Sequence, residues 1–301
     1  MILVTGASGF IGSHLIQALI AEYGVDQVVA LTSSAFPSVK SILHRDYNID
    51  DSYLLDSGCE AVTTIIHAGA FTPKNLVEAN DIVKSSNNIN NTNKLLRQKL
   101  PNLKKVVFLS TIDVYENTHT TITEQTPVGP ESLYGHSKFY CEGLVKTYCD
   151  HIEADYSILR IGHVYGPGEE KYKKLIPEVM RSILRNRPVK LWGDGQDRRS
   201  FIYISDVVKA VVNASKTLGV FGPINVVSDK SYSIKEIVDT AIKVSSLDVE
   251  IETVTSNYIR RDLIFNNLTL KKYLHEPEVD LYKGLKMEWI HMKESYEKNN
   301  L

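Results

Sequence analysis

Apolar runs alternate with amphipathic stretches along the first half of the chain. Runs rich in apolar and β-branched residues predict strands at residues 2–5, 27–32, 62–67, 104–110 and 155–162. Helical patterns fall between these strands, near residues 10–22, 75–99 and 132–150. This alternation is typical of parallel βαβ units, and strands that are apolar throughout are typical of a sheet covered on both faces. The pattern therefore predicts an α/β fold built on a doubly wound parallel sheet.

The pattern becomes less regular after Gly166-Pro167-Gly168. It predicts helices and short strands in this order: a helix near 172–186, strands at 189–192 and 201–204, and helices near 206–218 and 281–297. No repeat or flexible linker separates the two regions, so we expect them to pack closely. We expect a larger domain of residues 1–165 plus about 200–228, and a smaller α/β domain of residues 166–199 and about 229–301.

Composition excludes several classes of protein. The 301 residues carry a formal net charge of −2, which gives no reason to expect nucleic acid or an anionic membrane surface as partner. No apolar run approaches the ~20 residues of a membrane span, and the chain starts directly with a strand, without room for a signal peptide. Cys59, Cys141 and Cys149 are too few and too irregularly spaced for a disulfide framework or a metal site. We therefore expect buried free thiols, no metal and a cytoplasmic location.

Three glycines punctuate the turn after the first strand. Gly6, Gly9 and Gly12 stand three residues apart in the segment Thr5-Gly-Ala-Ser-Gly-Phe-Ile-Gly12. Gly6 and Gly9 can take positive φ and expose backbone N–H groups, while Gly12 allows the new helix to pack tightly on the strand. The positive end of that helix favours phosphate. A dinucleotide site is the preferred interpretation, although the spacing meets the usual Gly-x-Gly-x-x-Gly fingerprint only in part. A glycine-rich turn without a ligand is the alternative.

Candidate acid–base chemistry lies in Tyr134-Gly-His-Ser-Lys138. On a helix these two side chains share one face, and an ammonium together with a cationic nicotinamide favours the phenolate. Taken alone, such a pair is usually a surface feature. Ser110 and Thr111 end the strand before it, where loops line the ligand crevice of a parallel sheet. Thr111 is interpreted as functional, whereas Ser110 can equally satisfy a turn amide.

These motifs together resemble the extended short-chain dehydrogenase/reductases. The resemblance rests on Thr5–Gly12, His67-Ala-Gly-Ala70, Ser110-Thr111 followed by Val114-Tyr115, and Tyr134-x-x-x-Lys138. Two further segments, Leu159–Gly168 and Gly193–Ile202, narrow it to the NAD-dependent epimerase/dehydratase family of nucleotide-sugar epimerases, dehydratases and reductases. The resemblance runs from residue 2 to about residue 295. It implies a Rossmann-type NAD(P)-binding domain and a smaller nucleotide-sugar-binding domain.

The resemblance also implies roles for individual residues. Thr111 would hydrogen-bond the reacting oxygen, Tyr134 would be the general acid/base, and Lys138 would lower the pKa of Tyr134 and hold the nicotinamide ribose. Cofactor contacts are implied for Gly6, Ser8, Gly9, Phe10, Ile11, Gly12, Thr32, Ser33, Asp46, Tyr47, Ala68, Gly69, Ala70, Ser110, Tyr134 and Lys138. Substrate contacts are implied for Thr111, Asp113, His163, Arg199 and Arg261, with Arg260 an alternative to Arg261. His67 is interpreted as a packed core histidine.

Two departures from the family pattern are informative. Ile112 and Asp113 stand where the dehydratases of the family carry an Asp-Glu pair, so dehydratase activity is not expected. The second strand runs into Thr32-Ser33-Ser34 without the acidic residue typical of NAD-preferring members. This slightly favours NADP over NAD, although the arginine common in NADP-selective relatives is missing. Lys40 is either its substitute or an exposed loop lysine.

The resemblance favours a reductase that acts on the 4-keto group of a nucleoside-diphosphate 4-keto-6-deoxyhexose. His163, in His-Val-Tyr-Gly-Pro-Gly168, and the later Leu175-Ile176-Pro177 are similar to segments of bacterial 4-ketoreductases. A nucleotide-sugar 4-epimerase with tightly bound NAD is the alternative, and a non-catalytic dinucleotide-sensing protein is a remote one. A homodimer is expected, since family dimers pair helices 75–99 and 132–150. Four residues on those helices lie either in this interface or against the chain's own sheet: Leu95, Leu96, Leu144 and Val145.

Overall fold

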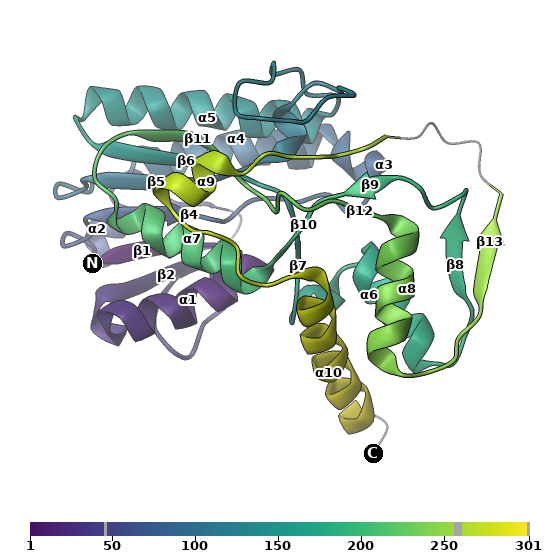
Figure 1. The fold of residues 1–301 in the computed structure, drawn as a ribbon. Helices are drawn as coiled ribbons and strands as arrows, with labels where there is room; N and C mark the ends of the chain where they lie inside the picture. The colour runs from purple at the N-terminus through teal and green to yellow at the C-terminus, as the bar shows by residue number, and fades with distance from the viewer. Residues whose placement is uncertain (45–46, 256–260, 300–301) are drawn as a thin grey trace.

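A seven-stranded parallel sheet forms the centre of the molecule (Figure 1). The computed structural model describes residues 1–44, 47–255 and 261–299. The sheet order is β11-β6-β5-β4-β1-β2-β3, and every neighbouring pair is parallel. The strands are β1 (Ile2–Thr5), β2 (Val28–Thr32), β3 (Lys40–Leu43), β4 (Thr64–His67), β5 (Lys105–Thr111), β6 (Asp155–Ile161) and β11 (Phe221–Val226). The predicted doubly wound, Rossmann-type sheet is confirmed.

Helices cover both faces of this sheet (Figure 1). On one face lie α1 (Phe10–Tyr23) and α7 (Ile204–Lys216); on the other lie α4 (Ile82–Leu96) and α5 (Leu133–His151). Every residue of β1, β2 and β5 is buried, as expected for strands that have helices on both sides. The single-turn helices α2 (Tyr53–Asp56) and α3 (Leu76–Ala79) lie in connections on the face of the sheet that α4 and α5 cover.

A second group of elements lies beyond the carboxyl edge of the sheet (Figure 1). Short strands pair there as β7 (His163–Tyr165) with β10 (Phe201–Tyr203), β8 (Val189–Trp192) with β13 (Ile251–Val254), and β9 (Arg198–Arg199) with β12 (Tyr232–Ser233). The helices of this region are α6 (Leu175–Leu184), α8 (Ile234–Ser245) and α10 (Leu281–Asn299), whereas α9 (Leu268–Tyr273) packs against β11 of the sheet. The close packing expected between the two regions is present, because one continuous apolar core includes residues of both. The exact domain boundaries stay a prediction.

Several elements differ from the predicted pattern. The helix expected at 75–99 is divided into α3 and α4, because the Asp81 carboxylate accepts the Lys84 N–H and starts a new helix. β3 and β11 were not predicted, since β3 is an exposed edge strand and β11 contains Gly222-Pro223, a pair typical of turns. α8 was also missed, although its capping box between Ser233 and Glu236 is visible in the sequence.

The cysteine prediction is confirmed: Cys59, Cys141 and Cys149 are free and buried, the last two on α5. Within the described residues, the helices all fall short of the length and apolarity that a bilayer crossing demands.

Candidate active site

The loop between β1 and α1 approaches the chain after β4 at backbone distance. Gly6 has φ of +69°, and a Cβ placed there would lie 2.6 Å from the Gly69 Cα. A Cβ on Gly12 would lie 2.0 Å from the Gly6 carbonyl oxygen, so Gly12 packs against the loop itself rather than against the strand as predicted. The positive φ predicted for Gly9 is wrong, because Gly9 is extended at φ −75° and precedes the first helical residue.

The start of α1 has the properties of an anion site. In the described part of the chain no side chain caps this helix, so the N–H groups of its first turn are available, and the helix dipole favours negative charge there. Ser8 in the loop is exposed, and its hydroxyl oxygen accepts a hydrogen bond from Thr32 at the end of β2 (3.2 Å). Ser33 and Ser34 follow with exposed side chains. The residues therefore fit the pyrophosphate and ribose of a dinucleotide.

Buried polar groups of β1, β4 and α4 support this loop. The Thr5 hydroxyl lies 2.7 Å from His67 Nδ1 and accepts the Gly69 N–H, while His67 Nε2 lies 3.0 Å from the Thr92 hydroxyl. Burial, together with the charge of Lys138, lowers the pKa of His67 to about 3, so its ring is neutral. The interpretation of His67 as a core histidine is confirmed. Ala68, Gly69 and Ala70 are small at the point where Gly69 packs on Gly6.

Tyr47 lies next to the glycine loop, whereas Lys40 does not. Tyr47 is buried, its phenol oxygen would lie 3.1 Å from a Cβ on Gly69, and burial raises its pKa to about 12. It therefore supports the loop rather than lying open to solvent, and Asp46 beside it is outside the described residues. Lys40 lies at the amino end of β3, away from the crevice, and its ammonium donates to the carbonyls of Ser57 and Gly58. The interpretation of Lys40 as an exposed lysine is confirmed.

The first turns of α5 carry Tyr134 and Lys138 into the interior, where they are 6% and 3% exposed. Ser132 caps the helix by accepting the Gly135 N–H (3.1 Å), and Gly135 lets this turn pack on the Asp113 carbonyl, since a Cβ would lie 2.4 Å from that oxygen. Thr111 ends β5 on the same side, and its hydroxyl acts on the Tyr134 phenol. The structure thus brings Thr111 and Tyr134 together, and Lys138 lies one helical turn further along α5, with its ammonium over the Phe108 ring of β5.

The electrostatics of the pair differ from the expectation. Burial raises the pKa of Tyr134 and the Asp113 carboxylate raises it further, whereas the hydroxyls of Thr111 and Thr72 lower it. Among the described groups, Lys138 is not one that shifts the pKa of Tyr134. Its ammonium lies 4.2 Å from the ring centre of Phe108, and burial lowers its own pKa to about 8. In this structure Tyr134 is therefore a protonated phenol, and the Lys138 ammonium loses its proton more readily than an exposed lysine does.

Asn88 on α4 is a positioning residue that the sequence analysis missed. Its side-chain oxygen accepts the Phe71 N–H (2.8 Å), and its amide donates to the Phe71 carbonyl and to the Ser137 hydroxyl. Phe71 meets the Tyr134 ring edge to face, with ring centres 6.3 Å apart. Asn88 is 4% exposed. Its hydrogen bonds connect Phe71 to the helix turn that carries Tyr134.

The Ser110 hydroxyl has a partner within the protein. It donates to Glu142 (2.5 Å), whose carboxylate also binds Arg160 through two hydrogen bonds of 3.0 and 2.8 Å. This buried group links β5, β6 and α5. The cofactor contact implied for Ser110 stays a prediction.

A cluster of cationic side chains lies around His163. Burial lowers the pKa of His163 to about 4, and the charges of Arg199, Lys174 and Arg261 lower it further. Lys174 and Arg261 also act on Asp113, whose side chain is solvent-accessible although protein surrounds it on most sides, as expected at the wall of a crevice. The predicted substrate residues therefore converge. Lys174, a basic residue directly before α6, was missed.

The neighbouring arginines are distinguishable. Arg198 binds the hydroxyl and carbonyl of Ser231 and lies 3.8 Å from Glu236, so its partners differ from those of Arg199. Arg199 donates to the Arg261 carbonyl, and Arg261 pairs with Glu131 at 3.0 Å. Arg260, the alternative to Arg261, is outside the described residues.

Comparison with known proteins places this chain among nucleotide-sugar enzymes. It is 29% identical over 308 residues to a putative UDP-glucose 4-epimerase of Methanocaldococcus jannaschii, covering 96% of this chain and 98% of the relative. It is 30% identical over 234 residues to a dTDP-D-glucose 4,6-dehydratase of Dictyostelium discoideum, covering 69% of this chain and only 54% of that relative. The crystal structure of a UDP-glucuronic acid 4-epimerase from Bacillus cereus, in complex with UDP-glucuronic acid and NAD, superposes with a TM-score of 0.85 at 28% identity, covering 98% of this chain and 99% of that one.

The family itself follows from the first 226 residues. The sequence profile of the NAD dependent epimerase/dehydratase family matches residues 2–226, which include the glycine loop, Thr111, Tyr134 and Lys138. This protein belongs to the NAD-dependent epimerase/dehydratase family.

Proposed function

We propose that this chain transfers hydride at C4 of a nucleoside-diphosphate sugar, with NAD or NADP as its cofactor. The observation that carries the proposal is the convergence of Thr111, Tyr134 and Lys138 between the glycine loop and a crevice lined by cations. Bound NAD(P) supplies the hydride donor or acceptor. A dinucleotide-sensing protein without catalysis would have no use for a buried phenol and ammonium beside such a crevice.

The roles of the chain's residues follow from their positions. Tyr134 gives a proton to the sugar oxygen or takes one from it, and Thr111 orients that oxygen. Lys138 holds the ribose by the hydrogen bonds of its ammonium. Arg199, Lys174 and Arg261 bind the diphosphate, since three cations converge there and an arginine fork engages two phosphate oxygens. The Asp113 carboxylate accepts a hydrogen bond from a hydroxyl group of the sugar.

Reduction of a 4-keto-6-deoxyhexose is one candidate for the net reaction. Burial and Asp113 keep the Tyr134 phenol protonated, which suits a residue that must give a proton to a keto oxygen. The exposed Ser33 and Ser34, which follow β2 in the acid-free segment Thr32-Ser33-Ser34, are compatible with the 2′-phosphate of NADPH.

Epimerisation at C4 is the second candidate, and the relatives favour it. Both the full-length relative from Methanocaldococcus jannaschii and the Bacillus cereus structure are named as 4-epimerases, the latter with NAD bound. The same Thr111, Tyr134 and Lys138 would serve both reactions, because an epimerase oxidises and then reduces one carbon. Ile112, buried and apolar where dehydratases of the family carry an acid, speaks against water elimination.

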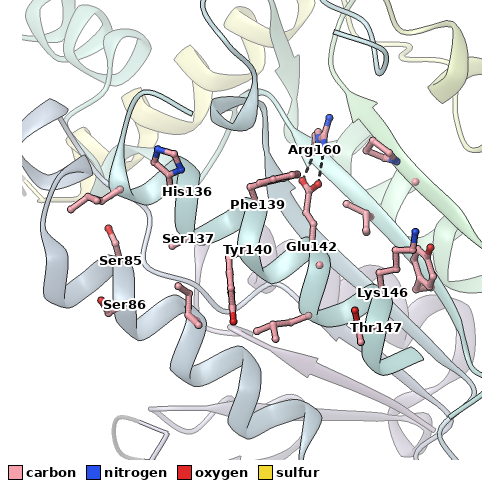
Figure 2. A pocket seen from close by; sticks show the side chains of 18 of the residues that line it. Ser85, Ser86, His136, Ser137, Phe139, Tyr140, Glu142, Lys146, Thr147 and Arg160 are labelled. Carbon is pink, nitrogen blue, oxygen red and sulfur yellow. Dashed lines mark hydrogen bonds and ion pairs between the residues drawn. The ribbon is translucent and has the colours of Figure 1, made fainter. Parts of the chain in front are cut away.

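We also propose that two copies pair through α4 and α5. A groove of about 950 Å³ runs along α5 beside Ser85 and Ser86 of α4, with Phe139 and Tyr140 projecting from α5 (Figure 2). Large apolar side chains that line it stand exposed, among them Ile82, Phe139 and Tyr140. An apolar patch of this kind marks an interface. Of the four residues considered above, Leu95, Leu96 and Val145 are buried against the chain's own sheet, and Leu144 lines the groove.

Gly12→Ala should abolish tight dinucleotide binding. Its Cβ would lie 2.0 Å from the Gly6 carbonyl oxygen, so the loop must move and the anion site is lost. We expect the dissociation constants of NADH and NADPH, measured by fluorescence titration, to rise at least about tenfold, which is about 1.4 kcal/mol. The exposed Gln17→Ala on the same helix is the control and should bind as the wild type does. Equal binding by Gly12→Ala and the wild type would contradict this.

The net reaction can be read from cofactor stoichiometry. Incubation with UDP-sugars and with 4-keto-6-deoxy intermediates, in the presence of NAD, NADH or NADPH, should give product detectable by mass spectrometry and chromatography. Consumption of one NAD(P)H for each product indicates the reductase, and C4 inversion without net consumption indicates the epimerase. Loss of water from the sugar would contradict both candidate reactions.

Tyr134→Phe should remove turnover and leave cofactor binding nearly unchanged. The variant keeps the buried ring but not the proton that the reaction moves, so we expect kcat to fall by about 10²- to 10⁴-fold. Tyr148→Phe, on the same helix but four turns along, is the matched control. A Tyr134→Phe enzyme with wild-type kcat would exclude the phenol from the chemistry.

Ile82→Asp should weaken the proposed dimer. Ile82 is 68% exposed in the single chain, and a carboxylate there would be buried by the second copy. We expect the dimer dissociation constant, from sedimentation or light scattering, to rise at least about tenfold. Leu218→Asp replaces a side chain that is 84% exposed elsewhere and should leave the dimer intact. A wild-type protein that is monomeric at micromolar concentration would refute the interface.

A further inference from the structure

Two buried carboxyl groups lie below the substrate crevice. Glu169 belongs to the single-turn helix η3 (Glu169–Lys171), directly after Gly166-Pro167-Gly168, and Glu288 belongs to α10. They are 1% and 0% exposed. Within the described chain, Glu169 Oε2 and both carboxylate oxygens of Glu288 have no hydrogen-bond partner. A buried carboxylate is costly unless it is paired or protonated, so these two groups require an explanation.

Glu169 has a cationic partner that reaches the crevice. Its Oε1 lies 3.3 Å from Lys174 Nζ, and the Lys174 side chain is 38% exposed, whereas that of Glu169 is 2% exposed. The Lys174 charge also acts on His163 and Asp113, which line the crevice. Glu169 therefore lies behind Lys174, and it can influence a bound substrate only through that ammonium.

Among the described residues, Glu288 has no such partner. The charged groups that act on it are the carboxylates of Glu169 and Glu170 on η3. The Tyr203 phenol lies near it, and burial raises the pKa of that phenol to about 12. Glu170 is itself held by the Gly168 N–H at 2.7 Å and lies 3.5 Å from His291 of α10. Burial and the two neighbouring carboxylates raise the pKa of Glu288 to about 8, and burial raises that of Glu169 to about 7 despite Lys174. The Lys174 ammonium opposes this rise at Glu169 alone, so Glu288 holds its proton more tightly than Glu169 does.

We propose that Glu169 is a positioning residue that holds the Lys174 ammonium toward the substrate diphosphate, and that Glu288 stays protonated beneath it so that Glu169 carries the single negative charge of the pair. The position of the proton follows from the contacts, because Glu169 has a cation within ion-pair distance and Glu288 has only anions. A lysine side chain is long and flexible, and holding it before the substrate arrives reduces the entropy lost on binding. The role of Lys174 rests on the proposed function, whereas the protonation of Glu288 does not.

A double-mutant cycle with UDP-glucose as the probe tests the positioning role. Glu169→Gln and Lys174→Met should each weaken UDP-glucose binding by about five- to tenfold, and the double variant should bind no worse than Lys174→Met alone. Where turnover is detected, KM should rise while kcat stays within about twofold. Between pH 8 and pH 6 wild-type binding should weaken as Glu169 takes up a proton, and Glu169→Gln should not follow; His163 titrates below this range.

The outcomes of this cycle separate two failures. If Lys174→Met weakens binding but Glu169→Gln does not, or if the two effects add in full, the positioning role of Glu169 is wrong. If the wild type binds no UDP-glucose, the proposed diphosphate site is wrong, and the Glu288 measurement below still decides the location of the proton.

Glu288→Gln tests that proton without any ligand. A glutamine has the shape of a protonated glutamic acid, and it does not ionise. Because the folded pKa of Glu288 lies above its ordinary value, the wild type loses stability as pH rises from about 4.5 to about 8, and the variant does not. We expect equal melting temperatures at pH 5 and a variant at least about 5 °C more stable at pH 8.

The exposed Glu294→Gln on the same helix is the control and should track the wild type at every pH. If Glu288→Gln lowers the melting temperature equally at pH 5 and pH 8, Glu288 is ionised and paired, and the proposal is overturned.

Discussion

The contact of backbone on backbone between the β1–α1 loop and the end of β4 is the constraint on which the binding region depends. Gly6, Gly12 and Gly69 meet where a Cβ would come within 2.0–3.0 Å of main-chain atoms. This contact holds the start of α1 against the sheet edge, with its N–H groups open. Since β5 is two strands from β1, at ~4.8 Å per strand, Thr111 at the end of β5 lies about 10 Å from the loop. An extended dinucleotide anchored at the loop can span that distance to Tyr134.

Electrostatics divide the crevice into two parts. At the chemical end, burial keeps Tyr134 protonated, lowers the pKa of Lys138 to about 8 and leaves His67 neutral. At the other end, burial lowers the pKa of His163 to about 4, and the charges of Arg199, Lys174 and Arg261 lower it further. Under the proposed function, the diphosphate of the substrate binds at the second end, which places the attached sugar toward the phenol.

The sequence predicted the buried elements well and the edges poorly. β1, β2 and β5 are apolar throughout because helices cover both of their faces, and that requirement is visible residue by residue. β3 is exposed at the sheet edge and β11 contains a Gly-Pro pair, so neither meets the usual strand pattern. Tyr134 and Lys138 are one helical turn apart, but it was the resemblance to the family, and not this spacing alone, that made them candidates together with Thr111.

Contacts between distant segments were not predictable. The hydroxyl of Ser110 binds Glu142, and Asn88 supports Phe71, through tertiary packing that leaves no local signal. Lys174 was missed because its meaning comes from Glu169 and His163 on other elements. The predicted positive φ at Gly9 failed for a related reason: a glycine permits such a conformation, and the surrounding packing decides whether it is used.

The segment from Gly166 to Lys174 connects the two ends of the crevice. Its Pro167 carbonyl lies 2.7 Å from His14 Nε2 on α1, and Tyr172 packs near Phe10, so it touches the helix that faces the dinucleotide. Its other end carries Lys174 to the substrate side. Helix α10 buries Glu288 beneath this segment. Tyr165, which precedes the segment, contacts α10 at Gly284. The last helix of the chain therefore supports both proposed binding regions. A buried acid under such a segment costs stability, and its retention is understandable if the charge it leaves on Glu169 is what keeps Lys174 directed at the substrate.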